Sequence, residues 1–270
     1  MSVSLDQIVA ATRRRVAEAK LVSDLRQLDR QAVSHVPRGF RHALESASQN
    51  GIAVIAELKR ASPSRGLIRS DFDSASLATE LEDGGAAALS VLTDAEFFQG
   101  SLENLRRASS SAKLPCLRKD FIIDEFQLLE ARANNADAIL LIVAALSPEE
   151  LKLLAARAGE FCLDVLCEVH DEDELHRAQD AGCSLIGVNS RDLRTFKVDL
   201  ETALRLADLI PNNALRVAES GINSGTDIAR LRAAGYHAFL IGESLMKAKS
   251  TGEALKTLLL EAQRDSLVRR

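Results

Sequence analysis

The chain has 270 residues, of which 46% are hydrophobic and 27% are charged, and its formal net charge is −5. A chain of this length buries a large core and suits either two ordinary domains or a single α/β barrel. The acidic balance argues against nucleic acid as a main partner, and 4% aromatic residues with no tryptophan argue against a base-stacking platform or a membrane aromatic belt.

The first 48 residues are expected to form a helical extension packed on a barrel. Residues 5–21 and 41–47 have the spacing of amphipathic helices, and Pro37 and Gly39 separate them. The three consecutive arginines at 13–15 are interpreted as a solvated helix face rather than a site for an anionic partner. Such an extension could cap one barrel mouth or help to cover a substrate.

Residues 49–270 are expected to form one catalytic (β/α)8 barrel, the TIM-barrel fold. Short runs rich in Val, Ile, Leu and Ala recur along this segment, and a stretch with helical periodicity follows each run. The runs are nearly continuous rather than alternating, which indicates strands buried on both faces of a parallel sheet. We expect eight strands, at residues 52–58, 88–92, 116–119, 138–143, 164–169, 185–189, 216–220 and 238–242.

Capping signals support these strand–helix units. Ser and Asp precede several of the helical stretches, as at Asp73, Ser147 and Ser224. Glycines are expected to close helices in the left-handed conformation at positions 84–85, 159, 182 and 235. A doubly wound open sheet is the alternative, but no Gly-x-Gly-x-x-Gly follows the first strand.

Polar and ionisable residues collect where the predicted strands end, which in a barrel is the face that carries the active site. Glu57 and Lys59 lie two residues apart and therefore project from one face of the first strand. Core packing gives no reason for charges at strand ends, so we expect a reaction centre in which a lysine donates protons and a glutamate accepts them. The other predicted strand ends carry Lys119, Asp120, Glu168, Asn189, Arg191, Glu219, Ser220, Gly242 and Glu243.

The last two strand–helix connections are expected to bind a phosphate group. Gly221 follows the seventh strand and Gly242 ends the eighth. Glycine lets the backbone approach an anion closely, and N–H groups at a helix start point toward it. Ser62 and Ser64 of the first loop could add hydroxyl donors. The predicted substrate is a phosphorylated small molecule, with ordinary tight turns as the alternative explanation of the two glycines.

The segment His170-Asp171-Glu172-Asp173-Glu174-Leu175-His176 has the composition of a metal site but not its spacing. Acidic residues are favoured in the first turn of a helix by the helix dipole. We therefore expect no metal. The chain also has no dinucleotide fingerprint, so no cofactor is expected.

Seven segments resemble the indole-3-glycerol phosphate synthase family of tryptophan biosynthesis. The resemblance covers nearly all of the barrel in the right order, and the N-terminal helices also look like those of the family. It implies a (β/α)8 barrel that converts 1-(2-carboxyphenylamino)-1-deoxyribulose 5-phosphate into indole-3-glycerol phosphate, CO₂ and water. The segments are AELKRASPSRG (56–66), SVLTDAEFFQGS (90–101), LPCLRKDFIIDEFQ (114–127), LCEVHDEDEL (166–175), IGVNSRDL (186–193), AESGI (218–222) and FLIGESLM (239–246).

The resemblance also implies roles for single residues. Lys119 looks like the general acid, Glu168 like the carboxylate of the dehydration step, and Lys59 like the group that binds the substrate carboxylate and assists proton transfer. Orienting roles are implied for Glu57, Asn189 and Glu219, and substrate contact for Arg191. The phosphate-binding positions are matched by Ser62, Ser220, Gly221, Gly242 and Glu243, the last through its backbone N–H because some members carry serine there. The anthranilate ring would be walled by Phe98, Phe121, Leu140 and Leu193.

Three other functions stay open at this point. A phosphoribosylanthranilate isomerase would need a cysteine and an aspartate as its acid–base pair, and Cys116 lies on the third strand. An aldolase would use Lys119 to form an imine with its substrate. A barrel that only binds a phosphorylated ligand would not require Lys119, Glu168 and Lys59 together.

A cytoplasmic location is expected. No run approaches the roughly 20 apolar residues that span a bilayer, so no membrane association is expected, and the N-terminus does not look like a signal peptide. The four cysteines form no Cys-x-x-Cys pair and are interpreted as free thiols of a reducing compartment. Association with other tryptophan-pathway enzymes is a further prediction.

Overall fold

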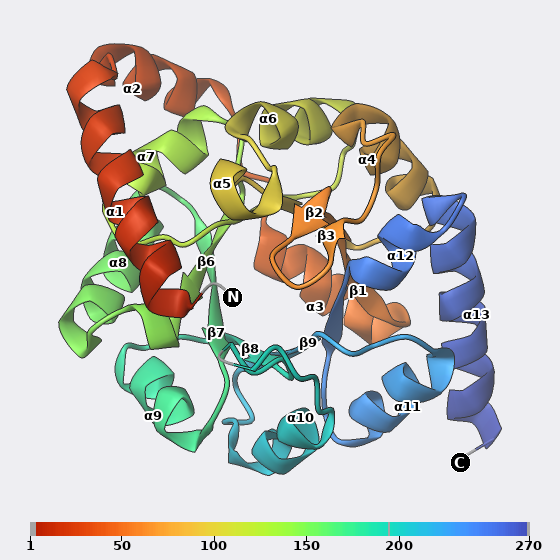
Figure 1. Ribbon diagram of the computed structural model, residues 1–270. Helices are drawn as coiled ribbons and strands as arrows, with labels where there is room; N and C mark the ends of the chain where they lie inside the picture. Colours follow the sequence, from red (N-terminus) through yellow and green to blue (C-terminus); the bar gives the residue numbers. More distant parts are fainter. Residues whose placement is uncertain (1–3, 194, 269–270) are drawn as a thin grey trace.

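A computed structural model describes residues 4–193 and 195–268 and contains a closed barrel of eight parallel strands. The helices form a ring around these strands (Figure 1). The barrel strands are β1 (Ala53–Leu58), β4 (Ala88–Leu92), β5 (Cys116–Lys119), β6 (Ala138–Ile142), β7 (Asp164–Val169), β8 (Leu185–Asn189), β9 (Leu215–Glu219) and β10 (Ala238–Ile241). The predicted (β/α)8 barrel is confirmed, with each strand within one residue of its expected bounds.

One main helix follows each strand. These helices are α4 (Ser74–Asp83), α6 (Leu102–Ser111), α7 (Phe126–Ala133), α8 (Pro148–Glu160), α9 (Glu172–Asp180), α10 (Glu201–Leu206), α11 (Gly225–Ala233) and α13 (Thr251–Val268). Shorter elements sit in the connections: α5 (Ala95–Phe98), α12 (Glu243–Lys247) and the 3₁₀ turns η1 (Val143–Ala145) and η2 (Ala207–Leu209). None of the described helices is both long and apolar enough to cross a bilayer.

Three of the predicted helix starts are capped by the expected side chains. The side chains of Asp73, Ser147 and Ser224 accept from backbone N–H groups at the starts of α4, α8 and α11. Each such bond satisfies one N–H group that has no partner within its helix. The expected glycine cap at Gly159 is wrong: Gly159 lies inside α8, and the left-handed residue beyond that helix is Cys162, with φ +54°.

Two hydrophobic layers result from the alternation of side chains along the strands. One layer lies between the strands and the surrounding helices and includes Val54, Leu89 and Ile139. The other fills the barrel interior and includes Ile55 and Leu166. Because inward and outward positions alternate, the last inward positions of several strands come to one rim, where the polar residues lie.

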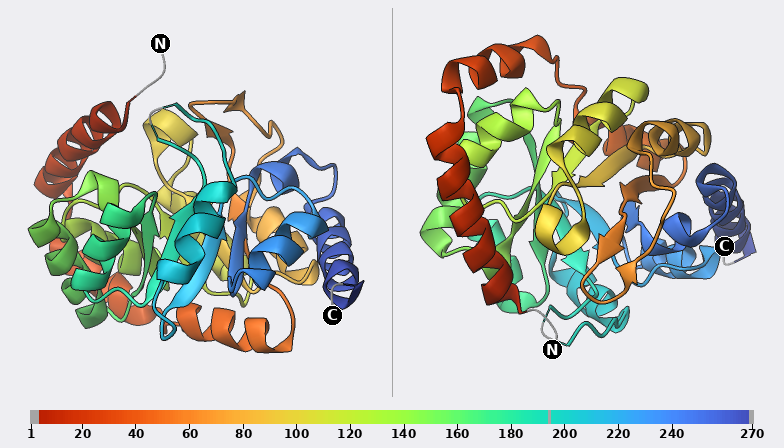
Figure 2. Two further views of the ribbon diagram at one scale, coloured as in Figure 1. Left: turned by 90° about the horizontal axis from the view of Figure 1, so that it is seen from below. Right: turned by 45° about the horizontal axis from the view of Figure 1, so that its top comes forward.

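The N-terminal helical extension contains three helices, α1 (Leu5–Val22), α2 (Leu25–Ser34) and α3 (Phe40–Asn50). α3 lies under the barrel, while the start of α1 lies at the opposite face (Figure 2). Phe40 and Leu44 of α3 belong to the interior layer and so close its lower end. The sequence pattern missed α2, whose only buried residue is Ala32. A domain boundary at residue 48 stays a prediction.

A short antiparallel pair inside the first loop was also not predicted. Its strands are β2 (Ala61–Ser62) and β3 (Gly66–Leu67). Strands of this length carry no readable alternation, and the hairpin stands above the catalytic rim (Figure 2). It places Ser62 and Ser64 over the barrel mouth.

Asp137 attaches the segment between α2 and α3 to the barrel. Its buried carboxylate accepts from the backbone N–H, Nε and Nη2 of Arg38 at 2.8, 3.0 and 2.6 Å, and it lies 3.0 Å from His35 Nε2. It also accepts from the backbone N–H of Cys116 at 2.7 Å. One carboxylate therefore satisfies donors from the extension and from a barrel strand.

We expect Asp137→Ala to lower the free energy of unfolding by about 3–5 kcal/mol, because it leaves a partly buried arginine without its counter-charge. Equilibrium urea unfolding measures the change. Asp180→Ala, on the exposed end of α9, is the control and should change stability by no more than about 0.5 kcal/mol. Equal losses in the two variants would contradict the anchoring role.

Candidate active site

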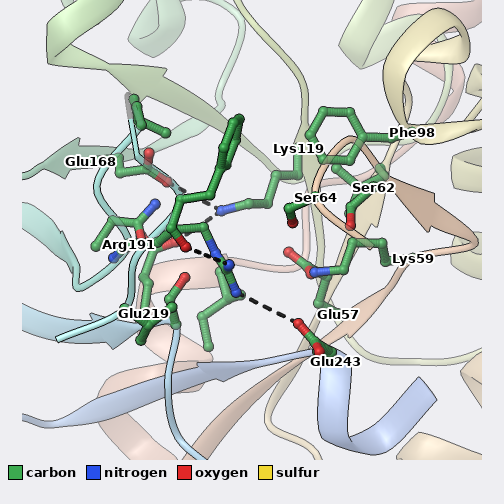
Figure 3. Close-up of a pocket in the computed structure, with 18 of the residues that line it drawn as sticks. Glu57, Lys59, Ser62, Ser64, Phe98, Lys119, Glu168, Arg191, Glu219 and Glu243 are labelled. Carbon is green, nitrogen blue, oxygen red and sulfur yellow. Dashed lines mark hydrogen bonds and ion pairs between the residues drawn. The ribbon is translucent and has the colours of Figure 1, made fainter. Parts of the chain in front are cut away.

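The C-terminal ends of the barrel strands surround a cavity of about 550 Å³ (Figure 3). The structure brings all the predicted site residues to this one cavity. Its lining includes Glu57, Lys59, Ser62, Phe98, Lys119, Phe121, Leu140, Glu168, Asn189, Arg191, Leu193, Glu219, Ser220, Gly221, Gly242 and Glu243.

Lys119 reaches into the middle of the cavity from the end of β5 (Figure 3). Its Nζ lies 2.8 Å from Glu219 Oε2 and 3.3 Å from Glu168 Oε2. Burial alone would lower the pKa of Lys119, but the charges of Glu219, Glu168 and Glu57 outweigh it and raise the pKa above its ordinary value. The ammonium therefore stays protonated and can act as an acid.

Glu57 and Lys59 lie on the other side of the cavity from Glu168 and Glu219 (Figure 3). Lys59 Nζ is 2.5 Å from Glu57 Oε1. Burial pushes the pKa of Glu57 up, but Lys59 and Lys119 pull it further down, so the net pKa is lowered. The ammonium of Lys59, paired with the carboxylate of Glu57, therefore faces the same cavity as the ammonium of Lys119.

Glu168 and Glu219 differ in their electrostatic surroundings although both touch Lys119. For Glu168, the effect of burial is outweighed by Lys119, His170 and a hydrogen bond with Asn189, which lower its pKa. For Glu219, burial and the neighbouring Glu168 prevail and raise the pKa to about 7. Two carboxyl groups that contact the same ammonium but differ in pKa suit a sequence of proton transfers.

Glycine at two positions, one inside β8 and one directly after β10, makes room for these carboxylates. A Cβ atom at Gly187 of β8 would overlap Glu219 Oε1, and one at Gly242 would overlap Glu57 Oε1. No signal in the sequence marked Gly187 as part of the site, because its role is to leave space rather than to contact a ligand.

The loops after β9 and β10 line one part of the cavity. Ser220 and Gly221 both have left-handed backbone conformations, with φ of +65° and +79°. A Cβ at Gly221 would overlap the side chain of Val198. This turn brings backbone rather than side chains to the cavity, as a site for an anion requires.

Glu243 holds the cations around the loop after β10. Its carboxylate lies 3.0 Å from Arg65 Nε, 3.5 Å from Arg191 Nη2 and 2.6 Å from Lys247 Nζ. Arg65 follows the serines of the first loop and was not singled out from the sequence. The glutamate therefore joins the first loop to the last one across the cavity mouth.

Apolar side chains form another part of the cavity lining, an apolar wall. The rings of Phe98 and Phe121 are 6.3 Å apart between centroids and tilted by 39°. Leu140 and Leu193 continue this wall, and α1 adds Leu5 and Ile8. The sequence suggested that the extension could help to cover a substrate, but not which residues of α1 would do so, because nothing local in a helix that ends at Val22 says where it packs on a barrel that begins at Ala53.

Arg15 corrects the interpretation of the arginine triplet for one of its three members, since Arg13 and Arg14 are exposed as predicted. Arg15 is not part of a solvated face: its guanidinium lies 2.7 Å from Asp94 Oδ2 and 2.9 Å from Asp120 Oδ1, both of them buried. Arg118 contacts the other oxygen of Asp120 at 3.1 Å. α1 is thus tied to the residue that follows Lys119.

The structure offers no ligand set for a metal among the described residues: no three His, Cys, Asp or Glu side chains are grouped for it. Cys116 is also outside the cavity. It is fully buried, and this burial raises the pKa of its thiol to about 12, so it does not supply the acid–base cysteine of an isomerase.

The fold and the cavity define a (β/α)8-barrel enzyme that carries lysine and glutamate acid–base groups beside an apolar wall. A family model described as indole-3-glycerol phosphate synthase matches residues 5–258. The indole-3-glycerol phosphate synthase of Koribacter versatilis (strain Ellin345) is 60% identical over 259 residues, which cover 96% of this chain and 100% of that protein. The chain belongs to the indole-3-glycerol phosphate synthase family. Its activity is that of a carboxy-lyase of tryptophan biosynthesis, which forms indole-3-glycerol phosphate.

Two more distant solved structures share the fold alone. KGPDC from Streptococcus mutans superposes with a TM-score of 0.61 at 13% identity, covering 79% of this chain and 98% of that one. Thiamine phosphate pyrophosphorylase from Pyrococcus furiosus gives 0.59 at 14% identity, covering 79% and 96%. At such identities they say nothing about the reaction.

We expect Gly187→Ala to reduce turnover about 10- to 100-fold, because the new Cβ forces Glu219 away from Lys119 and small misplacements of catalytic groups are costly. Steady-state kinetics measures the loss. Gly159→Ala is the matched control, since a Cβ there meets nothing within 4 Å. Full activity of Gly187→Ala would show that the position of Glu219 does not matter.

Proposed function

We propose that Lys119 is the general acid of ring closure, with the roles of the other groups following from their places around it. The observation that carries this proposal is its ammonium, 2.8 Å from Glu219 and 3.3 Å from Glu168, in a cavity that also has an apolar wall. In this step the aromatic carbon that bears the carboxylate attacks the C2′ carbonyl carbon. Lys119 gives its proton to the carbonyl oxygen, which becomes a hydroxyl.

Decarboxylation follows in the proposed sequence. The bond between the ring and the carboxylate breaks, CO₂ leaves, and its electron pair returns to the ring system. Lys59 holds the carboxylate until then, and Glu57 fixes Lys59 through their 2.5 Å contact. This step requires no proton donor of its own.

Dehydration completes the indole. The hydroxyl formed in the first step leaves C2′ as water with a proton from Lys59, Glu168 takes a proton from the neighbouring C1′ methylene of the new five-membered ring, and the C1′–C2′ double bond forms. Asn189 orients Glu168, and Glu219 orients Lys119. The lowered pKa of Glu168 supports its role as the base because it is an anion at neutral pH.

The phosphate of the substrate would lie at the loops after β9 and β10. Ser220, Gly221, Gly242 and the backbone of Glu243 line this part of the cavity, and Ser62 comes from the first loop. Arg191 is near enough to contact the substrate, and Phe98, Phe121, Leu140 and Leu193 would flank its aromatic ring. The chemistry of this lining suits a substrate with an apolar ring at one end and a phosphate at the other.

An imine-forming aldolase is disfavoured by the state of Lys119. An amine must lose its proton to attack a carbonyl, whereas the surrounding carboxylates raise the pKa of this lysine. Borohydride with substrate should therefore leave no covalent adduct on the protein.

We expect Lys119→Ala to reduce turnover by at least about 10²–10⁴-fold, the usual contribution of a positioned proton donor. The assay follows indole fluorescence after addition of the carboxyphenylamino deoxyribulose phosphate. Lys119→Arg keeps the charge but not the acidity, and it should also be slow. Unchanged turnover in either variant would refute the assignment.

We expect Glu243→Gln to lower KM several-fold, because it removes a negative charge beside the phosphate site and releases Arg65 and Arg191 from their carboxylate partner. Inhibition by inorganic phosphate should strengthen in parallel, which checks that the effect concerns the anion. A higher KM would mean that the carboxylate is needed to position the arginines.

A cytoplasmic location is proposed on the state of the thiols, since Cys116, Cys162, Cys167 and Cys183 are all free. Association with other enzymes of the tryptophan pathway likewise stays a proposal.

A further inference from the structure

His170 lies beside Glu168 but is not one of the residues that line the cavity. It follows the end of β7, and its side chain is largely buried. Its Nδ1 is 2.9 Å from Glu174 Oε2, and its backbone N–H donates to the same oxygen at 2.8 Å. Its Nε2 has no hydrogen-bond partner among the residues that the structure describes, and it lies 3.5 Å from Glu168 Oε1.

The two oxygens of Glu168 thus face different cations. Oε2 faces the ammonium of Lys119 at 3.3 Å, and Oε1 faces the imidazole of His170. Glu174 is itself fixed in the first turn of α9, where its backbone N–H donates to Asp171 at 2.9 Å. Glu174, His170 and Glu168 therefore form a chain of contacts that runs from the start of α9 to the cavity.

The charged groups around His170 are mainly acidic. Glu168 approaches from β7, Glu174 from α9 and Glu219 from β9. The nearby cation of α9, Arg177, donates to the carbonyl oxygen of Leu146. Burial lowers the pKa of His170, but the hydrogen bond with Glu174 and the acidic charges outweigh it and raise the pKa.

We propose that His170 is a positioning residue for the reaction: anchored by Glu174, its imidazolium holds Glu168 as an anion, with one carboxylate oxygen turned toward Lys119. The inference rests on the proposed role of Glu168 as the base of the dehydration step. It also gives a function to a segment whose composition suggested a metal. His170 of this segment acts on a glutamate instead.

The consequence is a defined dependence on pH. A cation near a carboxylate lowers the carboxylate's pKa, typically by 1–3 units at 4–6 Å or less. Removing His170 should therefore raise the pKa of Glu168 and move the acid limb of the kcat/KM profile to higher pH. The difference from the parent should shrink as pH rises above the pKa of Glu168 in both proteins, because the carboxylate is then an anion in each.

The test compares three variants by pH–rate profiles. In His170→Asn the side-chain amide can still reach Glu174 but carries no charge toward Glu168. We expect its acid limb to move up by about one unit, with kcat/KM reduced by up to about tenfold below the limb and unchanged well above it. Glu174→Gln should shift the limb in the same direction by less. His176→Gln, on the exposed face of α9, should leave the profile unchanged.

A second measurement needs no turnover. NMR titration of the His170 imidazole in the parent and in Glu168→Gln reads the coupling directly, because the coupling between two sites is reciprocal. We expect the pKa of His170 to fall in Glu168→Gln. An unchanged pKa would overturn the proposal, as would an acid limb in His170→Asn that coincides with that of the parent.

Loss of activity alone does not support the proposal. A uniform fall of kcat/KM at all pH values in His170→Asn would indicate a structural role and would overturn it. Turnover of Glu168→Gln separates the two hypotheses. If Glu168→Gln is inactive and His170→Asn keeps the parent profile, only the inference about His170 fails; if Glu168→Gln is fully active, the proposed role of Glu168 fails.

Discussion

A buried ammonium surrounded by carboxylates is the constraint on which this site depends. Lys119 contacts Glu168 and Glu219 directly, and the charge of Glu57 adds to theirs. An unpaired charge at this depth would be costly, so the four side chains stabilise one another only if they meet. They come from four strands, and the two that contact each other most closely, Lys119 and Glu219, are 100 residues apart along the chain.

The closed barrel supplies that meeting point with little help from flexible loops. Parallel strands bring their last inward positions to one rim, and Gly187 and Gly242 leave the volume that the carboxylates occupy. Rigid strands position charges more accurately than loops do. The loops and the β2–β3 hairpin then add the groups that contact the ends of a substrate.

The extension contributes to both ends of the barrel. α3 closes the interior from below with Phe40 and Leu44, whereas α1 reaches the catalytic rim with Arg15, Leu5 and Ile8. Arg15 of the extension pairs with Asp120, the residue that follows Lys119 in the chain. The extension is therefore coupled to the site and to the core at once.

The amino-acid sequence by itself determined the eight strands, the helix caps and the polar residues at the strand ends, because these depend on local periodicity and on spacing within one element. It also indicated the protein family, through motifs such as those around Lys59 and Lys119. Only the tertiary structure decided that Arg15 pairs with two buried aspartates, that Gly187 makes room for Glu219, and that His170 faces Glu168. Each of these contacts joins elements that are far apart in the sequence. It therefore depends on how the barrel closes and not on any local pattern.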